Sequence, residues 1–400
     1  MGRGVAYSTT EPAHLLNVRA EGMSSISGEP NHFADWFQVR GGDRRGFAQR
    51  RLFAAYLGEL LDEAVNGGKT QLVHSTAERA ARDGHWQIDL AYGSSVQADA
   101  LVLAIGNQEP GRLRAFVDAG PRYIANPWGQ AAQVAIRDLA ETGGAALLVG
   151  TGLTMVDLVL SLEAAGHDGP VLAVSRRGQI PRSHADFEPV PVKEDDVPAG
   201  DLHALSRWLR RRSAEVGWRA AVDSLRPHSQ ALWQSLSTEQ QRRFVRHVRP
   251  WWDVHRHRIA PEVAQLLARL VSEGFLEVAA GRIVSAQSRG DGIEVSIRRR
   301  GAQEDQTRLF AYVFNCTGPL QAMDRTNDPL LRALLDDGSI QSDRLGMGIL
   351  VDDHSRAEGA KDLWALGPLT KGRYWEIIAV PDIREQAAAV ADDIAKELAK

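Results

Sequence analysis

The sequence predicts an α/β protein, and three observations carry this prediction. First, an apolar run, a Gly-x-Gly turn, a helical pattern and a second apolar run follow one another over residues 145–175. Second, residues 69–107 and residues 276–319 each alternate apolar and polar residues before an apolar run that ends at a glycine. Third, a chain of 400 residues exceeds one ordinary hydrophobic core, which favours two lobes.

The clearest element is the unit between residues 145 and 175. Residues 145–149 are predicted to form a buried strand and residues 150–152 a turn. Residues 153–165 have helical spacing, and Gly166 stops that helix. A further strand at residues 171–175 completes a βαβ unit of about 30 residues.

The two alternating stretches predict β-meanders that return to a parallel sheet. The first leads to an apolar strand at residues 100–105, which ends at Gly106. The second leads to an apolar strand at residues 312–316, which ends at Gly318. Short alternating strands followed by a buried one are typical of such an excursion, so we interpret the pair as a degenerate duplication.

Residues 201–270 change character, because Trp, Arg and His become frequent and the strand pattern disappears. We interpret this segment as a helical insertion. The C-terminal part predicts a strand ending at Gly367, a loop, and a helix from about Asp382.

These elements predict two Rossmann-like, three-layer lobes with β-meanders and a helical insertion. We assign residues 1–125 and 312–400 to a discontinuous first lobe. Residues 126–200 and 271–311 form the second lobe, and residues 201–270 the insertion.

Composition excludes several classes of protein. The chain is 44% hydrophobic and 24% charged with a net charge of −4, which argues against a nucleic-acid-binding surface. The lone Cys316 excludes a disulfide framework, a cysteine zinc site and a Cys-x-x-Cys redox centre. No run approaches the roughly 20 apolar residues of a membrane helix, and no signal peptide is recognisable. We expect a soluble cytoplasmic protein without a membrane or nucleic-acid partner; the oligomeric state is not indicated.

The turn Gly150-Thr151-Gly152 predicts a nucleotide site because it follows a strand and opens a helix. The first glycine permits the tight turn, and the second lets the backbone approach a pyrophosphate. That phosphate would lie at the helix N-terminus, at Leu153 and Thr154. Met155 stands where a third small residue is usual, so the fingerprint is imperfect. The alternative is a Rossmann lobe that binds no nucleotide.

Arg176 and Arg177 follow the second strand, where an acidic residue would contact the ribose 2′-hydroxyl of NAD. Arginine there suits a 2′-phosphate, which predicts NADP.

Glycine ends three predicted strands, at Gly106, Gly318 and Gly367. Ligands of open α/β sheets lie outside the carboxyl ends of strands, and glycine there permits close backbone approach. Each glycine alone is more often part of a plain turn, but three together, two of them after a meander, favour a cofactor. The helix near Asp382 could aim its positive end at this ligand, although Asp382 could equally be a simple N-cap.

Two further patterns are rejected. The opening Gly2-Arg3-Gly4 is preceded by no strand and followed by turn residues, so it is not a pyrophosphate turn. His255 and His257 would share a face only on a strand, whereas their context is helical, so we expect no metal site.

Taken together, several stretches resemble the bacterial FAD/NAD(P)-binding oxidoreductases, distant relatives of flavin-containing monooxygenases that include proposed urate hydroxylases. The resemblance covers nearly the whole chain and is carried by GRGVAYSTTEPAHLLNVRAEGMSS, DALVLAIGN, VGTGLTMVDLVLSL, SRRGQIPRSH, VRPWWDVHRHR, FNCTGP and ALGPLTKGRYWEI. It implies a FAD lobe interrupted by an NAD(P) lobe. Family members begin with a strand and a G-x-G-x-x-G helix, and this chain begins after that unit, so we expect a first lobe truncated at its N-terminus.

The resemblance also implies site residues. Asn17 would lie beside the flavin ring as the catalytic residue, with a simple turn asparagine as the alternative. Residues expected near the nucleotides are Gly150, Thr151, Gly152, Leu153, Thr154, Arg176 and Arg177 for NADPH, and Gly106, Gly318, Gly367, Pro368 and Asp382 for FAD. Residues expected on the substrate side are Trp252, His255 and Trp375.

The implied activity is a flavin-dependent, monooxygenase-like oxidoreductase that uses NADPH. Hydride would pass from NADPH to FAD, and then to oxygen or directly to a small organic substrate. The alternative is a non-catalytic NADP-binding protein, or an inactive fragment unable to hold FAD.

Overall fold

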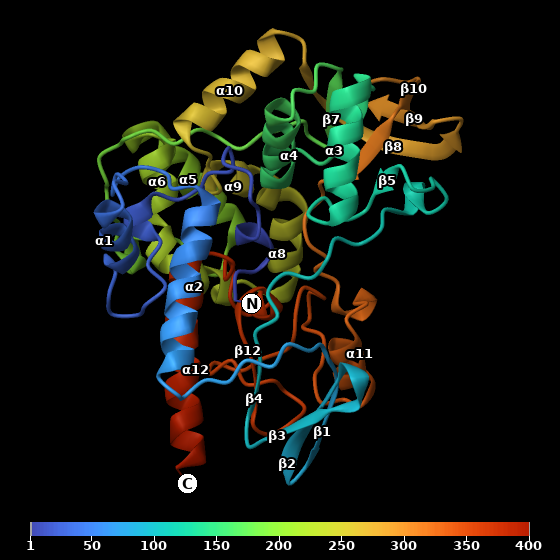
Figure 1. Ribbon diagram of the computed structural model, residues 1–400. Coiled ribbons are helices and arrows are strands. Elements are labelled where there is room, and N and C mark those ends of the chain that lie inside the picture. Colours follow the sequence, from blue (N-terminus) through green and yellow to red (C-terminus); the bar gives the residue numbers. More distant parts are fainter. Residues whose placement is uncertain (1, 400) are drawn as a thin grey trace.

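A computed structural model describes residues 2–399 and shows a mixed α/β fold (Figure 1). The strands described form a seven-stranded sheet, a three-stranded sheet and a two-stranded sheet. The seven-stranded sheet lies in the upper part of Figure 1, and the two smaller sheets lie in the lower part.

The seven-stranded sheet has the strand order β10-β9-β8-β7-β6-β11-β5. Its strands from β5 to β8 and β11 are parallel, whereas β9 and β10 form an antiparallel extension of β8. The strands are β5 (Tyr123–Ile124), β6 (Ala146–Val149), β7 (Val171–Ser175), β8 (Leu276–Arg289), β9 (Gly292–Arg299), β10 (Gln306–Phe310) and β11 (Tyr312–Asn315).

This lobe has the predicted three layers. One face of the parallel strands packs against helices α3 (Gln130–Thr142), α4 (Leu153–Ala164) and α10 (Pro261–Ser272). The other face packs against β9, β10 and the short helical turn Arg114–Phe116. Leu148 faces the helices and Leu147 faces the meander, because successive side chains of a strand point to opposite faces. The predicted βαβ unit is confirmed as β6, α4 and β7.

The second meander returns to a different sheet from the one expected. Strand β11, which the sequence analysis placed in the first lobe, pairs in parallel with both β6 and β5. Helix α10, placed in the insertion, contributes Leu267 and Leu270 to the core under the parallel strands. The lobe boundary assigned at residue 312 and the end of the insertion assigned at residue 270 therefore do not coincide with the ends of the seven-stranded sheet and its covering helices.

The smaller lobe is built on β1 (Ala77–Asp83), β2 (His85–Leu90) and β3 (Ser95–Ala98), the antiparallel meander predicted at residues 69–107. The chain then enters β4 (Leu101–Leu103), which pairs in parallel with β12 (Leu363–Ala365). Helix α11 (Pro329–Asp336) covers the meander, and a common core includes the fully buried Trp86, Leu103 and Leu331.

The predicted insertion is helical. It comprises α5 (Leu202–Val216), α6 (Trp218–Ser224), α7 (Ser229–Ser235), α8 (Thr238–Arg243), a π-helical turn at Phe244–Val248 and α9 (Arg249–Arg256). Trp233 of α7 packs on Met347 and Trp375, so the insertion rests on the chain that flanks β12.

The N-terminal segment contributes α1 (His32–Val39) and α2 (Arg50–Asn66), and the chain ends in α12 (Val380–Leu398). Arg50 of α2 donates two hydrogen bonds to the carboxylate of Asp157 in α4, both 2.8 Å long. Both side chains are more than nine-tenths buried. This bidentate pair joins the N-terminal segment to the helix that follows the Gly-x-Gly turn.

Replacing Arg50 with alanine leaves the Asp157 carboxylate buried without its partner. We expect the free energy of unfolding to fall by about 3–5 kcal/mol, because an unpaired buried charge is strongly unfavourable. Urea denaturation followed by circular dichroism measures this change. The control is Arg243→Ala, which breaks an exposed pair with Glu239 and should cost less than about 1 kcal/mol. Equal losses in the two variants would contradict the role given to Arg50.

Candidate functional site

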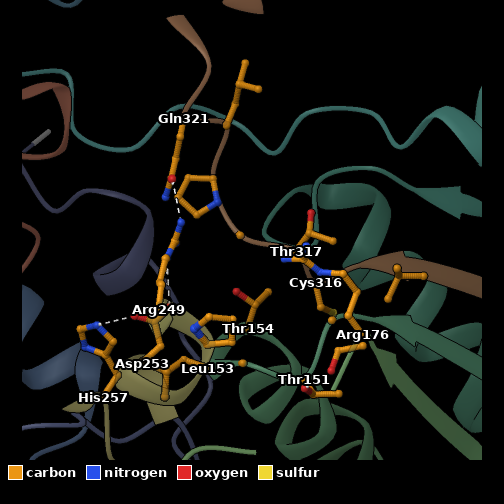
Figure 2. Close-up of a pocket in the computed structure, with 18 of the residues that line it drawn as sticks. Thr151, Leu153, Thr154, Arg176, Arg249, Asp253, His257, Cys316, Thr317 and Gln321 are labelled. Atoms are coloured by element: carbon orange, nitrogen blue, oxygen red, sulfur yellow. Dashed lines mark hydrogen bonds and ion pairs between the residues drawn. The ribbon is translucent and has the colours of Figure 1, made fainter. Parts of the chain in front are cut away.

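A single cavity of about 800 Å³ lies where the two lobes and the insertion meet (Figure 2). Its walls come from the turn between β6 and α4, the ends of β7 and β11, the segments after β4 and β12, and the last part of the insertion. The carboxyl ends of these parallel strands therefore open into one space, as expected of a ligand site in an open α/β sheet.

The turn Gly150-Thr151-Gly152 forms one wall of the cavity, and its two glycines serve different purposes. Gly150 has φ +122°, and a Cβ atom there would lie 2.2 Å from the carbonyl oxygen of Cys316. Gly150 thus lets β6 and β11 approach closely. Gly152 has an ordinary φ of −87°, and an added Cβ would meet nothing within 4 Å. Gly152 keeps open the space in front of α4.

The first turn of α4 presents unsatisfied amide groups to that space. Gly152 is the N-cap of the helix, and no side chain caps the turn. Leu153 and Thr154 line the cavity, so the free N–H groups and the helix dipole favour an anion there. Thr151 is buried; its hydroxyl donates to the carbonyl of Gln179 and lies 2.9 Å from the Ser175 hydroxyl, which ties the turn to β7.

The two consecutive arginines after β7 differ in their surroundings. Arg177 donates to the carbonyl oxygen of His247 at 3.1 Å, and its guanidinium lies 5.5 Å from the centre of the Trp251 ring. Arg176 is exposed, lines the cavity and has no hydrogen-bond or ion-pair partner among residues 2–399. Arg176 is therefore the one available to a phosphate, while Arg177 holds the insertion against the sheet.

Besides Arg249, two exposed arginines that the sequence analysis did not identify line the cavity. Arg246 belongs to the π-helical turn, and Arg282 lies on β8, the strand beside β7. Both are exposed and, within the described chain, make no ion pair. Only the pairing of β7 with β8 brings Arg282 near Arg176, and a pairing of this kind leaves no signal in a single sequence.

The opposite wall carries a polar row from helix α9 (Figure 2). Arg249 donates to Asp253 at 3.1 Å and to the side-chain oxygen of Gln321 at 3.0 Å. His257 lies 3.8 Å from the other oxygen of Asp253, and burial lowers the pKa of this histidine. The spacing of four residues between Arg249, Asp253 and His257, which places them on one helical face, could have identified this row.

Lys371 also lines this cavity, and it was not predicted. Only 6% of the surface of Lys371 is exposed, and its ammonium group has no hydrogen-bond partner in the part of the chain described. Burial lowers the pKa of Lys371 to about 8; the positive charge of Arg249 acts in the same direction, and Asp253 and Glu376 oppose it. Glu376 itself accepts hydrogen bonds from Trp252 at 2.5 Å and Arg256 at 3.1 Å.

Several predicted flavin-side residues border the same cavity. Gly106, Gly318 and Pro368 line it, and both glycines have positive φ with open space where a Cβ would stand. Gly367 is buried behind them, and its N–H donates to Gln386. Asp382 lies inside the first turn of α12, whose N-cap is Ala379 rather than Asp382.

Other predicted residues are not brought to the cavity. Asn17 lines a separate small cavity against α4 and α10, and its carbonyl oxygen accepts a hydrogen bond from His184. The His255 ring bonds to the carbonyl of Trp251 and packs edge-on against Trp218. Trp252 is held by Glu376, and Trp375 is buried against Trp233 with ring centres 4.7 Å apart.

Between residues 2 and 399, no group of three or more His, Cys, Asp or Glu residues is arranged to hold a metal ion. Within the same residues, no helix has both the length and the apolar character needed to cross a membrane.

The first part of the chain is similar to a known protein family. Residues 1–108 match a family model described as FAD-NAD(P)-binding. No curated protein matches the sequence.

Solved structures match over nearly the whole chain. L-lysine 6-monooxygenase from Pseudomonas syringae is similar with 19% identity and a TM-score of 0.64, over 96% of this chain and 87% of that one. Ornithine hydroxylase from Pseudomonas aeruginosa has 13% identity and a TM-score of 0.63, over 98% and 89% of the two chains. Ornithine N-hydroxylase from Kutzneria sp. 744, a complex with reduced FAD, NADP⁺ and L-ornithine, has 16% identity and a TM-score of 0.61, over 99% and 90%.

The chain therefore has the mixed α/β fold of these N-hydroxylating monooxygenases. The resemblance predicted from the sequence motifs is confirmed at the level of the fold.

Proposed function

We propose that the protein is an FAD- and NADPH-dependent oxidoreductase of the monooxygenase type that acts on a small organic molecule. One observation carries the proposal: the Gly150–Gly152 turn, Arg176 and the glycine-ended strands β4 and β11 all border one cavity. Two extended nucleotides whose reactive ends must meet require such a shared space.

The nicotinamide nucleotide would be held by the second lobe. The uncapped first turn of α4 would bind the pyrophosphate, and Gly152 leaves room for it. Arg176 would bind the 2′-phosphate of NADPH, with Arg246 and Arg282 on the same cavity as further positive charges.

The flavin would lie along Gly106, Gly318 and the start of α12. The backbone fits a flat ligand at these places, since both glycines face open space and no side chain caps the first turn of α12. FAD, when bound, supplies the chemistry of accepting hydride and passing electrons to oxygen or to an organic acceptor. The residues of this chain would bind it, orient it against NADPH and limit the access of water.

A role for the cysteine in redox catalysis is not supported. Cys316 lines the cavity but is buried, and burial together with the nearby Asp157 raises the pKa of its thiol. A thiol held in this way is not the thiolate that disulfide exchange needs. With a single cysteine in the chain, we propose oxygen or an organic molecule as the final acceptor.

We also propose a bacterial cytoplasmic setting. The bacterial source of the similar structures and the unpaired Cys316 support it. Ornithine was bound in the Kutzneria complex, and by analogy the substrate of this chain would be a small molecule.

The experiment that tests the proposal is reconstitution with FAD. We expect the purified chain to take up FAD with a visible flavin spectrum, and NADPH to bleach that spectrum under anaerobic conditions. A chain that takes up no FAD, or whose bound flavin NADPH leaves oxidised, contradicts the proposal.

Substitution of Arg176 tests the choice of nucleotide. We expect Arg176→Ala to weaken NADPH binding by about 10- to 100-fold, because it removes a charge-assisted contact of about 1.5–3 kcal/mol, and to leave NADH binding unchanged. Titration of each nucleotide by protein fluorescence measures this. Arg177→Ala is the matched control, and because Arg177 bonds to His247, its effect should be smaller and equal for both nucleotides. Equal loss of NADPH and NADH in Arg176→Ala would reject the 2′-phosphate assignment.

A second candidate is a non-catalytic NADP-binding protein. One observation favours it: among residues 2–399, β6 is the only strand that a Gly-x-Gly turn joins directly to an α-helix, so a second such turn is not present in this part of the chain. The two candidates separate in the reconstitution, since this one predicts NADPH binding without flavin uptake.

A further inference from the structure

Lys371 is the most unusual charged group of the cavity. A largely buried ammonium group without a hydrogen-bond partner is unfavourable, since it has lost much of its water and gained no hydrogen bond in exchange. Lys371 is 6% exposed, lines the cavity, and contacts Trp375 with its Nζ 5.3 Å from the ring centre. Such a group is suited to an anion that enters the cavity and supplies the missing partner.

The charged neighbours of Lys371 are already committed to other partners. Arg249 and Asp253 pair with each other, and His257 lies against Asp253. Glu376 is held by Trp252 and Arg256. Among the described residues, the ammonium of Lys371 is therefore the charge at this wall that forms no direct hydrogen bond or ion pair.

Apolar side chains line the cavity together with Lys371. Met347, Leu369 and Ile378 come from the segments on both sides of β12, and Met347 and Leu369 are buried. A single positive charge beside an apolar wall matches a molecule with one anionic group and an apolar body.

The phosphates of a dinucleotide have a separate place. The free Arg176, which would hold the 2′-phosphate, lies across the cavity from Arg249, Asp253 and His257, as Figure 2 shows. Lys371, whose charge interacts with Arg249 and Asp253, therefore lies on the side of the cavity away from the arginine proposed for the 2′-phosphate. One ammonium group balances one carboxylate, whereas a phosphate ester carries nearly two negative charges.

We propose that Lys371 binds the carboxylate of the substrate, and that the substrate is a small organic acid with an apolar body. That the bound acid is a substrate rests on the proposed function. That Lys371 binds a carboxylate rests on the cavity alone. Lys371 would then determine the specificity of the site for acids over neutral molecules.

The test is binding of small carboxylates to the purified full chain, measured by isothermal titration calorimetry without added flavin or nucleotide. The probes are benzoate, phenylacetate and hexanoate, each compared with its neutral amide. We expect at least one carboxylate to bind and its amide not to bind. Lys371→Met should weaken that binding by about 10- to 100-fold, which corresponds to one charge-assisted hydrogen bond. Lys371→Arg, which keeps the charge, should retain part of the affinity.

The control is Lys361→Met, which removes an exposed lysine from the turn before β12 and should leave binding unchanged. The dependence on pH gives an independent readout. Because only the protonated amine attracts the carboxylate, affinity should be constant below about pH 8, where Lys371 titrates, and fall about tenfold per unit above it. If Lys371→Met does not fold, the amide comparison, the arginine variant and the pH profile carry the test.

The proposal is overturned if no carboxylate binds the wild-type chain, if the amides bind as well as the acids, or if Lys371→Met binds like the wild type. Tighter binding of phenyl phosphate than of benzoate, lost in Lys371→Met, would overturn the carboxylate in favour of a phosphate. NADPH titration of the same samples separates the two proposals. Carboxylate binding without flavin uptake supports this site and rejects the oxidoreductase, and the reverse result rejects this site alone.

Discussion

Gly152→Asp is expected to abolish NADPH binding while leaving the protein folded. The backbone at Gly152 has φ −87°, which any residue can adopt, and nothing lies within 4 Å of an added Cβ. Aspartate is a better helix N-cap than glycine, so α4 should be as stable as before or slightly more so. Its carboxylate, however, would occupy the space of the pyrophosphate and repel it.

We expect the Kd for NADPH to rise by at least about 100-fold, since two like charges about 4 Å apart near a protein surface repel by about 4 kcal/mol. Fluorescence titration measures the Kd, and the thermal midpoint reports the fold. Gly152→Ala is the matched control, with a smaller steric effect and no charge. An aspartate variant that binds NADPH as well as the wild type would remove this turn from the nucleotide site.

Gly150→Ala is expected to have the opposite outcome, a damaged fold. A Cβ at this position would lie 2.2 Å from the carbonyl oxygen and 2.5 Å from the carbonyl carbon of Cys316, and φ is +122°. Since β6 and β11 are neighbours in the seven-stranded sheet, the added methyl group must push two paired strands apart. We expect a loss of about 3–5 kcal/mol in the free energy of unfolding, from overpacking together with backbone strain.

Urea denaturation measures the loss, and Gly318→Ala is the control. Gly318 also has positive φ, at +87°, but open space surrounds it, so only the backbone strain of about 1–2 kcal/mol applies. If the two variants lose the same stability, the close approach of β6 and β11 is not what requires glycine at position 150.

The local elements of the fold could be predicted from the sequence because each depends on short-range patterns. The strand–turn–helix–strand unit and both meanders were predicted and are present as β6-α4-β7, β1-β2-β3 and β8-β9-β10. The strand β11 was assigned to the first lobe but pairs with β5 and β6, since alternation and apolar runs do not say which strand lies beside which. The 14-residue strand β8 could not be predicted for the same reason. Its first part pairs in parallel with β7, and its last part pairs with β9 in the meander.

The site could be predicted where function requires a backbone geometry. Gly150, Gly152 and Arg176 follow from the order of strand, turn and helix, and all three border the cavity. The sequence could not distinguish Arg176 from Arg177, because a hydrogen bond to His247 in the insertion makes the difference.

Side chains that depend on tertiary burial were missed. Lys371 reads in the sequence as one lysine in a polar loop, and only the packing around it gives it a buried position. His255 was expected on the substrate side, but its ring packs against Trp218, and His257 lines the cavity instead. Asn17 was chosen by resemblance, and it lies in a different cavity.

The pair between Arg50 and Asp157 also bears on how the molecule can move. Its two short bonds fasten α2 to α4, and His14 adds a contact to the Asp157 carbonyl at 2.8 Å. The same N-terminal segment also reaches α12, where Arg384 donates to the Ser24 carbonyl at 3.0 Å. It therefore ties the helix behind the Gly-x-Gly turn to the last helix of the chain, and loss of the Arg50–Asp157 pair would loosen both ends of that link.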